Sequence, residues 1–243
     1  FFKIKNSLEI TSVADIPSFG SGLGSSSSFL VGLINCINFY YKLNMSKQKI
    51  AEIACKIEIN ILKKPIGMQD QYIASFGGLS WINFKSKKNI KVKKINIRKE
   101  KLEEFQNNLF LVYTNQLRKS EKILKKVKKE KNLIALKELS KLSIDFKNEL
   151  ENGNLDSLGE ILDKSWFIKK KLSSNTSNTH LNNMYKYGLS SGASGGKLLG
   201  AGGGGFMLFY VKKNNRKKFI KKFIKFNKIN FEFYKEGSQV FKI

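Results

Sequence analysis

A glycine- and serine-rich segment, GSGLGSSSS at residues 20–28, constrains the fold of this chain more than any other feature. Before it, the alternation of apolar and polar residues in NSLEITSVADIP predicts a strand. After it, the mostly apolar residues from Ser25 to Tyr41 predict a buried helix. A flexible linker would not join a strand directly to a buried helix. We therefore interpret the segment as an ordered loop that binds a ligand.

The composition of this loop favours an anion. Backbone N–H groups of a glycine-rich turn can converge on phosphate oxygens, and the start of the following helix adds N–H donors with a partial positive charge. Glycine permits both the close approach and the unusual φ values that such a turn needs. A serine hydroxyl can also ligate Mg²⁺. The loop differs from a Walker P-loop, because no lysine follows the glycines.

A second glycine run, GAGGGG at residues 200–205, has the spacing G-x-G-x-x-G. A dinucleotide-binding fold requires a helix after this motif, whereas FMLFYV, which follows here, reads as a strand. We therefore reject a Rossmann fold. The run is interpreted as a loop whose backbone approaches a ligand or the first glycine loop.

Two of the 19 acidic residues stand in apolar surroundings. Glu58 lies near the end of a mostly apolar helix that Ser46 caps, and Asp70 follows the helix break at Pro65 and Gly67. Phosphoryl transfer needs a metal held by oxygen ligands and often a carboxylate near the attacking hydroxyl. Alone, each carboxylate would more often be a surface or capping group. Together with two glycine loops they favour a phosphoryl-transfer site.

The net charge of +26, from 45 basic and 19 acidic residues, raises the alternative of a nucleic-acid-binding protein. Almost all the cations are lysines spread along the chain, and the arginines are only Arg98, Arg118 and Arg216. Readers of bases and phosphates usually rely on arginine forks. We therefore expect a lysine-rich surface and no nucleic-acid partner, with a field that attracts anionic small substrates.

The few cysteines and the single histidine exclude further classes of protein. Cys36 and Cys55 are predicted to be free, buried thiols in a reducing, cytoplasmic compartment. The single histidine, His180, excludes a multi-histidine metal site and argues against a Ser-His-Asp enzyme. No apolar run spans a membrane without polar interruption, so no membrane partner is expected.

The remaining pattern mixes strands and helices without strict βαβ repetition, which predicts an α+β fold. Strands are predicted at 79–84, 90–97, 108–114, 206–211, 229–234 and 238–243, and helices within 118–150 (two) and at 155–172, 178–189 and 214–227. The helices within 118–150 would turn their leucines and other apolar side chains inward: Ile123, Leu124, Val127, Leu133, Leu136, Leu139 and Leu142. A boundary near residue 105 would divide the chain into domains at 1–105 and 106–243.

Three motifs resemble those of the GHMP small-molecule kinases. PSFGSGLGSSSS from Pro17 resembles the second motif of that family, and KLLGAGGGGF from Lys197 resembles the third. EINILKKPIGMQDQ from Glu58 resembles the segment that carries the family's magnesium glutamate and catalytic aspartate. The resemblance implies a two-lobed GHMP kinase fold, with a ribosomal-S5-like N-terminal part, a ferredoxin-like C-terminal part, and ATP and sugar bound between them.

Four segments together are most similar to the branch of the family that acts on D-glycero-D-manno-heptose 7-phosphate. They are GMQDQYIASFGG, LVYTNQLRKSEKIL, the predicted helix that contains Trp166 and Lys170, and GASGGKLLGAGGGGFMLFY. This similarity implies ATP-dependent phosphorylation of the anomeric hydroxyl to give the 1,7-bisphosphate, for nucleotide-activated heptose and surface polysaccharide. ATP and Mg²⁺ would be the cofactors, and a homodimer is a possible assembly. The implied alternatives are a galactokinase- or fucokinase-type sugar 1-kinase and a non-catalytic ligand sensor.

The resemblance also assigns roles to residues. Asp70 would be catalytic, and Ser26 with Glu58 would hold the metal. The implied ATP-binding residues are Gly20, Ser21, Gly22, Leu23, Gly24, Ser25 and Ser26, and the implied substrate-binding residues are Arg118, Gly202, Gly203 and Gly204.

Two features depart from the family pattern. The first motif of the family is absent, and the chain begins at Phe1, so we expect that an N-terminal portion has been lost. Asn115 stands where the branch commonly has a glycine.

Overall fold

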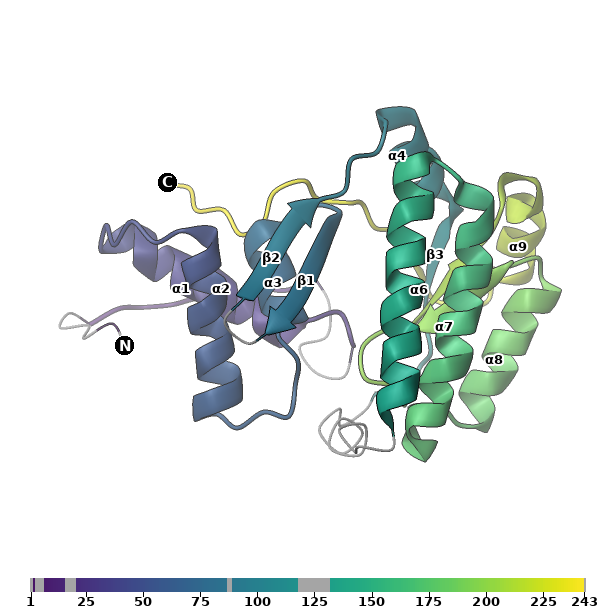
Figure 1. Ribbon diagram of the computed structural model, residues 1–243, viewed down its shortest axis with the longest axis horizontal. Coiled ribbons are helices and arrows are strands. Elements are labelled where there is room, and N and C mark those ends of the chain that lie inside the picture. The colour runs from purple at the N-terminus through teal and green to yellow at the C-terminus, as the bar shows by residue number, and fades with distance from the viewer. Residues whose placement is uncertain (1, 3–6, 16–20, 87–88, 118–131, 243) are drawn as a thin grey trace.

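The computed structural model describes residues 2, 7–15, 21–86, 89–117 and 132–242. Its elements form two groups, which we call the first lobe and the second lobe (Figure 1). The first lobe contains α1, α2, α3 and the β1–β2 hairpin. The second contains α4, β3 and the elements from α6 to β6.

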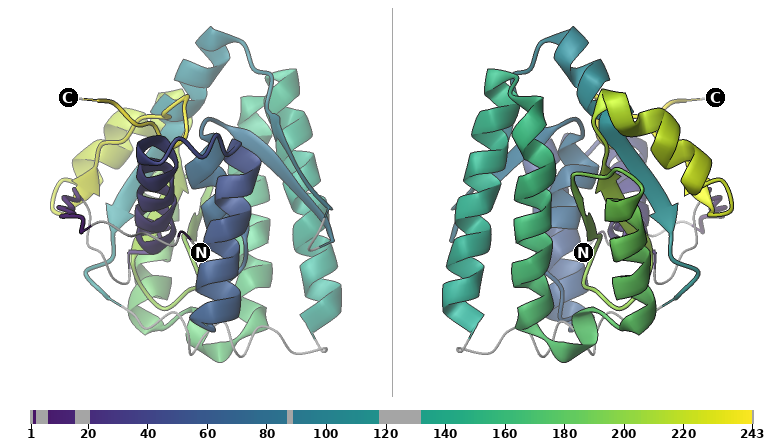
Figure 2. Two further views of the ribbon diagram at one scale, coloured as in Figure 1. Left: turned by 90° about the vertical axis from the view of Figure 1, so that its left-hand side faces the viewer. Right: turned by 90° about the vertical axis from the view of Figure 1, so that its right-hand side faces the viewer.

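The first lobe packs helices against one another and against a hairpin. In this lobe α1 and α2 stand side by side, and α3 contacts both of them and β1 (Figure 2). The backbone N–H of Lys49 donates to the Ser46 side chain (3.2 Å), which confirms the predicted cap of α2. The bounds are α1 Ser25–Tyr40, α2 Lys47–Cys55, a π-helical turn Lys56–Ile61, α3 Gln69–Phe76, β1 Ser80–Ser86 and β2 Asn89–Lys94.

The second lobe contains an antiparallel sheet in the order β4-β5-β3-β6, with helices packed on it. The main core joins this sheet to α7, α8 and α9 through buried aromatic and aliphatic side chains, among them Trp166, Leu181, Phe209 and Phe219. The bounds are α4 Lys99–Asn108, β3 Leu109–Tyr113, α6 Leu133–Asn152, α7 Leu158–Leu172, α8 Thr179–Ser190, β4 Gly195–Leu198, β5 Phe206–Tyr210, α9 Arg216–Lys222 and β6 Lys228–Ile229.

The predicted strand before the first glycine loop is wrong for the part that the structure describes. Residues 7–14 belong to no strand or helix, and they are exposed. An alternating sequence becomes a strand only when a neighbouring strand pairs with its backbone groups, and no described strand lies beside this segment. The helix after the loop is confirmed, although only one face of it is buried, and Phe29 and Phe39 are about half exposed.

The apolar face of α6 does not enter a core as predicted. Leu150 is its one buried residue, Leu133 and Leu136 are exposed, and Leu139 and Leu142 are half-buried. Leu136, Leu139 and Leu142 instead line the cleft described below, where a ligand or water replaces protein atoms. The other predicted inward residues, Ile123, Leu124 and Val127, lie outside the described residues.

The C-terminal strands predicted at 229–234 and 238–243 are largely absent. Only Lys228–Ile229 pairs with the sheet, and the chain then leaves the second lobe and returns to the first (Figure 1). Phe219 and Phe223 are buried and pack on Phe209 of β5, whereas Ile224 is exposed.

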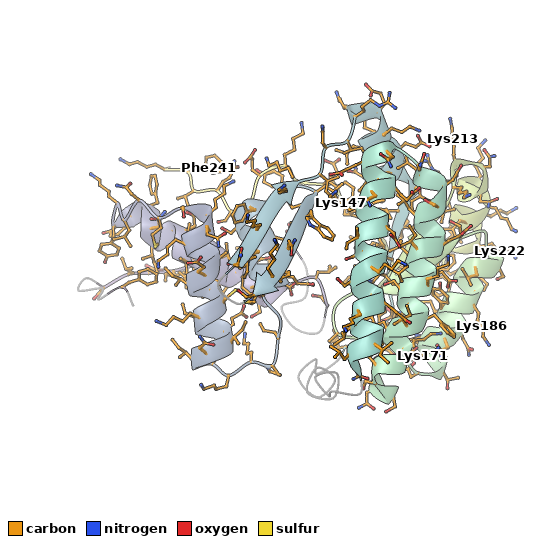
Figure 3. All side chains as sticks on the ribbon, viewed as in Figure 1. Lys147, Lys171, Lys186, Lys213, Lys222 and Phe241 are labelled. Carbon is orange, nitrogen blue, oxygen red and sulfur yellow. The ribbon has the colours of Figure 1, made fainter. Side chains whose placement is uncertain are left out.

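The structure also tests the predictions for the two cysteines, the lysine-rich surface and membrane-spanning helices. Cys55 is buried and Cys36 is exposed, so the prediction of two buried thiols holds for Cys55 only; both are free. Four of the lysines labelled on the second lobe in Figure 3, Lys171, Lys186, Lys213 and Lys222, are exposed and lie on or beside different helices. Within the described residues, no helix combines the length and the apolar composition needed to cross a membrane.

Candidate active site

The first glycine loop ends at Gly24, which is the N-cap of α1. Gly22 and Gly24 have φ values of +78° and +75°, a left-handed conformation that favours glycine. A Cβ atom at Gly24 would lie 3.4 Å from the Cβ and Cγ atoms of Asp70. The glycine therefore brings the loop and the start of α1 into contact with the predicted catalytic carboxylate.

Glu58 is the centre of a hydrogen-bond network behind this loop. Its carboxylate accepts from the hydroxyl of Ser26 (2.7 Å to Oε1), the hydroxyl of Ser27 (2.6 Å to Oε2) and Nε2 of Gln71 (2.6 Å to Oε2). Only 1% of Glu58 is exposed. The residue lies in the π-helical turn, a local widening of the helix that is frequent at functional sites.

The fourth partner of Glu58 is a cation that the sequence did not single out. Nζ of Lys64 lies 2.9 Å from Oε1 of Glu58 and 2.7 Å from Oγ of Ser26. The ammonium group thus contacts both predicted metal ligands. Its position in LKKP, after the helix, resembles an ordinary solvated lysine, and nothing in the local pattern distinguishes it from Lys63.

This network keeps Glu58 ionised. Burial alone would raise the pKa of Glu58, but the hydrogen bonds from Ser27, Lys64, Ser26 and Gln71 together outweigh it, and the net shift of the pKa is downward. A buried carboxylate with four donors carries its charge at neutral pH. Ser27 and Gln71 complete this arrangement.

Asp70 has the opposite environment. It lies in the first turn of α3, where the helix dipole favours a carboxylate, and its Oδ1 accepts from Nε2 of Gln69 (3.1 Å). Burial raises the pKa of Asp70, the charge of Glu58 raises it further, and the Gln69 hydrogen bond lowers it in part, with a net upward shift. A raised pKa makes this carboxylate a better proton acceptor than an ordinary aspartate.

The pair of Ser26 and Glu58 suits Mg²⁺. This ion prefers one or two protein oxygens and takes its remaining ligands from water and substrate phosphates. The ammonium group of Lys64 against both oxygens shows that this pair attracts a cation. Among the described residues, no group of three or more histidine, cysteine or acidic side chains is arranged so that it could hold a metal ion.

These residues open onto one cleft of about 940 Å³ that both lobes line. Such a volume lies at the upper end of the range for small-molecule sites, which leaves room for a nucleotide and a second small molecule. From the first lobe come Ser21, Gly22, Gly24, Ser25, Ser26, Glu58, Lys64, Asp70 and Trp81. From the second lobe come Leu136, Leu139, Lys147, Ser165, Lys169, Lys197, Gly200 and Ala201, among others.

The structure thus brings together most of the predicted site residues. Ser21, Gly22, Gly24, Ser25, Ser26, Glu58 and Asp70 all line the cleft, and Leu23 does not. Gly20 and Arg118 lie outside the described residues.

The second glycine loop meets the cleft only at its beginning. Gly200 and Ala201 line the cleft, whereas the three glycines predicted to bind substrate are not among its lining residues. A Cβ atom at Gly202 would lie 2.7 Å from Cα of Thr176, and one at Gly204 would lie 2.6 Å from the carbonyl oxygen of Gln116. The backbone N–H of Gly203 donates to the Thr176 carbonyl (2.8 Å). These glycines allow the loop to pack closely on neighbouring backbone.

Asn115 has a φ of +53°, in the left-handed region where glycine is the most favourable residue. Asparagine tolerates this conformation better than most other residues. The replacement of the glycine that is common in the related branch therefore leaves the backbone conformation accessible.

Two family models match the chain. GHMP kinases N terminal domain matches residues 2–78, and GHMP kinases C terminal matches residues 146–229. The chain belongs to the GHMP kinase family. The first match contains the glycine loop, Glu58 and Asp70, and the second contains the third motif. The rejection of a Rossmann fold agrees with this result and with strand β5 directly after the second glycine run.

Individual relatives agree with this assignment. D-glycero-alpha-D-manno-heptose 7-phosphate kinase of Campylobacter jejuni is 34% identical over 205 residues, which cover 83% of this chain and 60% of that protein. A solved Campylobacter jejuni protein described as a candidate sugar kinase is 35% identical with a TM-score of 0.72, and the match covers 92% of this chain and 65% of that one.

A solved D-glycero-D-manno-heptose 1-phosphate kinase from Bacteroides thetaiotaomicron has the same fold, with a TM-score of 0.75 at 23% identity. That match covers 92% of this chain and 64% of that one. The chain therefore spans slightly less than two thirds of the length of these relatives.

Proposed function

We propose that the protein is an ATP-dependent sugar kinase that phosphorylates the anomeric hydroxyl of a sugar phosphate, with D-glycero-D-manno-heptose 7-phosphate as the substrate. The observation that carries the proposal is the contact of the first glycine loop with Asp70, beside the network of Ser26, Glu58 and Lys64. The similarity to the Campylobacter jejuni heptose 7-phosphate kinase supports the choice of sugar.

In this proposal the start of α1 and the glycine loop bind the phosphates of ATP. The oxygen of the sugar hydroxyl forms a bond to the γ-phosphorus, and Asp70 accepts the proton of this hydroxyl. The bond between the γ-phosphorus and the β,γ-bridging oxygen breaks, and ADP leaves. Ser26 and Glu58 would hold Mg²⁺, which supplies positive charge to the phosphate oxygens.

Positioning and charge neutralisation then supply most of the rate enhancement. Asp70 has the raised pKa that suits a general base, whereas the lowered pKa of Glu58 suits a permanent anionic ligand. The two carboxylates would therefore have separate roles. We also propose that the reaction takes place in the cytoplasm, where free thiols such as Cys36 and Cys55 stay reduced.

A kinase assay on purified protein tests this function. It compares heptose 7-phosphate with galactose and fucose as the acceptor, with ATP as the donor. We expect ADP release and a bisphosphate product with heptose 7-phosphate. Turnover of galactose or fucose alone would instead favour a galactokinase- or fucokinase-type enzyme. ATP binding without turnover of any sugar would favour a ligand sensor.

A further inference from the structure

The two walls of the cleft carry different charges. Both acidic lining residues, Glu58 and Asp70, belong to the first lobe. The described lining residues of the second lobe include Lys147 on α6, Lys169 on α7 and Lys197 on β4, and no carboxylate. A ligand in the cleft therefore meets a cationic wall opposite the proposed catalytic groups.

Lys197 differs from the other two lysines in its partners. Nζ of Lys147 lies 2.6 Å from the Glu151 carboxylate, and Nζ of Lys169 donates to the carbonyls of Leu198 (2.9 Å) and Gly200 (2.5 Å). Lys197 has one hydrogen bond among the described residues, to the neutral hydroxyl of Ser165 (3.3 Å). Within these residues no acidic side chain forms an ion pair with it.

The charge of Lys197 is also poorly hydrated. The side chain is half-buried, and burial lowers the pKa of Lys197. A desolvated cation without an anionic partner is unfavourable, and a bound anion would remove this cost. The cleft that Lys197 lines is the place from which such an anion would come.

Close packing of α7 on β4 holds this lysine in place. A Cβ atom at Gly195 would lie 1.8 Å from the carbonyl oxygen of Gly159, so only glycine lets the two elements approach this closely. Ser165 and Lys169 lie four residues apart on α7, on one face of the helix. The ammonium group of Lys197 is therefore positioned beside a hydroxyl donor.

We propose that Lys197 and Ser165 bind the phosphate group that the acceptor sugar already carries, across the cleft from Asp70. A lysine is an effective point charge for phosphate, and the serine hydroxyl can donate a second hydrogen bond. A neutral sugar hydroxyl would not compensate the charge of Lys197. This site therefore selects a phosphorylated sugar over galactose or fucose. The inference rests on the proposed function and adds the residues that determine its substrate.

The test replaces Lys197 by methionine and measures binding of heptose 7-phosphate by titration calorimetry without ATP. We expect the affinity to fall about 10- to 100-fold, the usual effect of losing a hydrogen bond to a charged group. Affinity for ATP should change less than about twofold, since the nucleotide occupies the other wall. Lys197→Arg should recover part of the lost affinity. Lys147→Met is the matched control, because it removes the same charge from the same wall but from a lysine that already has a carboxylate.

Other results would overturn the inference. An equal loss of ATP affinity in Lys197→Met would mean that Lys197 binds a phosphate of the nucleotide. Unchanged affinity for both ligands would mean that Lys197 is only structural. If Lys197→Met does not fold, Ser165→Ala gives the same comparison, with an expected loss of about threefold to tenfold. Suppose that the wild-type protein phosphorylates heptose 7-phosphate and that neither variant loses affinity for this sugar. This result would refute the inference about Lys197 and leave the proposed function intact.

Discussion

At the scale of single residues, Asp70 is the one whose chemistry the proposed mechanism needs most. Asp70→Asn keeps the shape of the side chain but removes the proton acceptor. We expect kcat to fall by about two orders of magnitude or more, the scale of general-base loss, with little change in the KM for ATP. Steady-state kinetics checks this, with the exposed Asp156→Asn as control. Near-normal turnover would contradict the assignment of Asp70 as the base.

The raised pKa of Asp70 gives a second prediction with a definite sign. The folded protein holds this proton more tightly than the unfolded chain, so folding stability falls as pH rises through the range above the ordinary value of 3.8. At neutral pH the ionised carboxylate therefore destabilises the fold. We expect Asp70→Asn to raise Tm by about 1–3 °C at pH 7 while it lowers activity. Thermal melting of both proteins at pH 7 measures this difference. A lower Tm for Asp70→Asn would contradict the claim that the ionised carboxylate destabilises the fold.

Lys64 gives the third prediction, because its ammonium group occupies the position between Ser26 and Glu58 where the proposed metal would bind. A metal must displace this cation. Without nucleotide, we expect Lys64→Gln to bind Mn²⁺ about tenfold more tightly than wild type, the scale of one hydrogen bond to a charged group. Lys63→Gln removes the same charge from the exposed neighbouring residue and measures the long-range effect alone. Equal affinities in the two variants would contradict this competition.

At the scale of elements, the contact between α7 and β4 determines where the cationic wall lies. A methyl group at Gly195 would overlap the Gly159 carbonyl, which is backbone and cannot rotate away. We expect Gly195→Ala to destabilise the protein by about 3 kcal/mol, at the upper end for overpacking. Gly32→Ala is the control: a Cβ there meets no atom within 4 Å in the middle of α1, and about 0.5–1 kcal/mol of stabilisation is expected. Urea unfolding measures both, and equal midpoints would contradict the packing argument.

Among the helices and strands, sequence patterns predicted some elements correctly and others not. Helices with their own caps and breaks were predicted well, as at Ser46 and Pro65, because those signals are local. Strand predictions near the termini failed, since alternation in the sequence cannot show whether a partner strand is present. The prediction that the leucines of α6 enter a core was also wrong. Helical periodicity identifies an apolar face but does not show whether that face contacts a core or lines a cleft.

The sequence identified some residues of the site and missed others, because only some of them have a local signal. Ser26, Glu58 and Asp70 stand out through glycine loops and apolar surroundings, which are visible in the sequence. Lys64 and Lys197 resemble the many solvated lysines of this chain, and their roles depend on contacts between segments far apart in the sequence. Such residues could be found only once the fold placed them.

At the scale of the whole molecule, the C-terminal segment joins the two lobes. Phe233 belongs to the second lobe, where it stacks on Phe105 with ring centroids 5.6 Å apart. From Tyr234 the chain contacts the first lobe, where Gly78 N–H donates to the Tyr234 carbonyl and Ser238 N–H donates to the Ala74 carbonyl. A Cβ atom at Gly237 would lie 2.0 Å from the Ser75 carbonyl oxygen, so the segment lies directly on the end of α3, the helix that carries Asp70.

Removal of residues 234–243 should therefore weaken the first lobe and not the second. The deletion removes the backbone hydrogen bond from Ser238 to Ala74 of α3 and the bond from Gly78, just after α3, to Tyr234. It also removes the bonds that the Asn35 side chain of α1 donates to Ser238. Hydrogen exchange should become faster for the amides of α1 and α3, while those of β3 and β5 keep their protection, because local opening follows local contacts. The matched control removes only residues 241–243, among them the exposed Phe241 at the end of the chain (Figure 3), and should leave both lobes unchanged. Equal loss of protection in β3 and α3 after the longer deletion would mean that the two lobes unfold as one unit, and that the segment stabilises the whole fold instead of holding Asp70 in place.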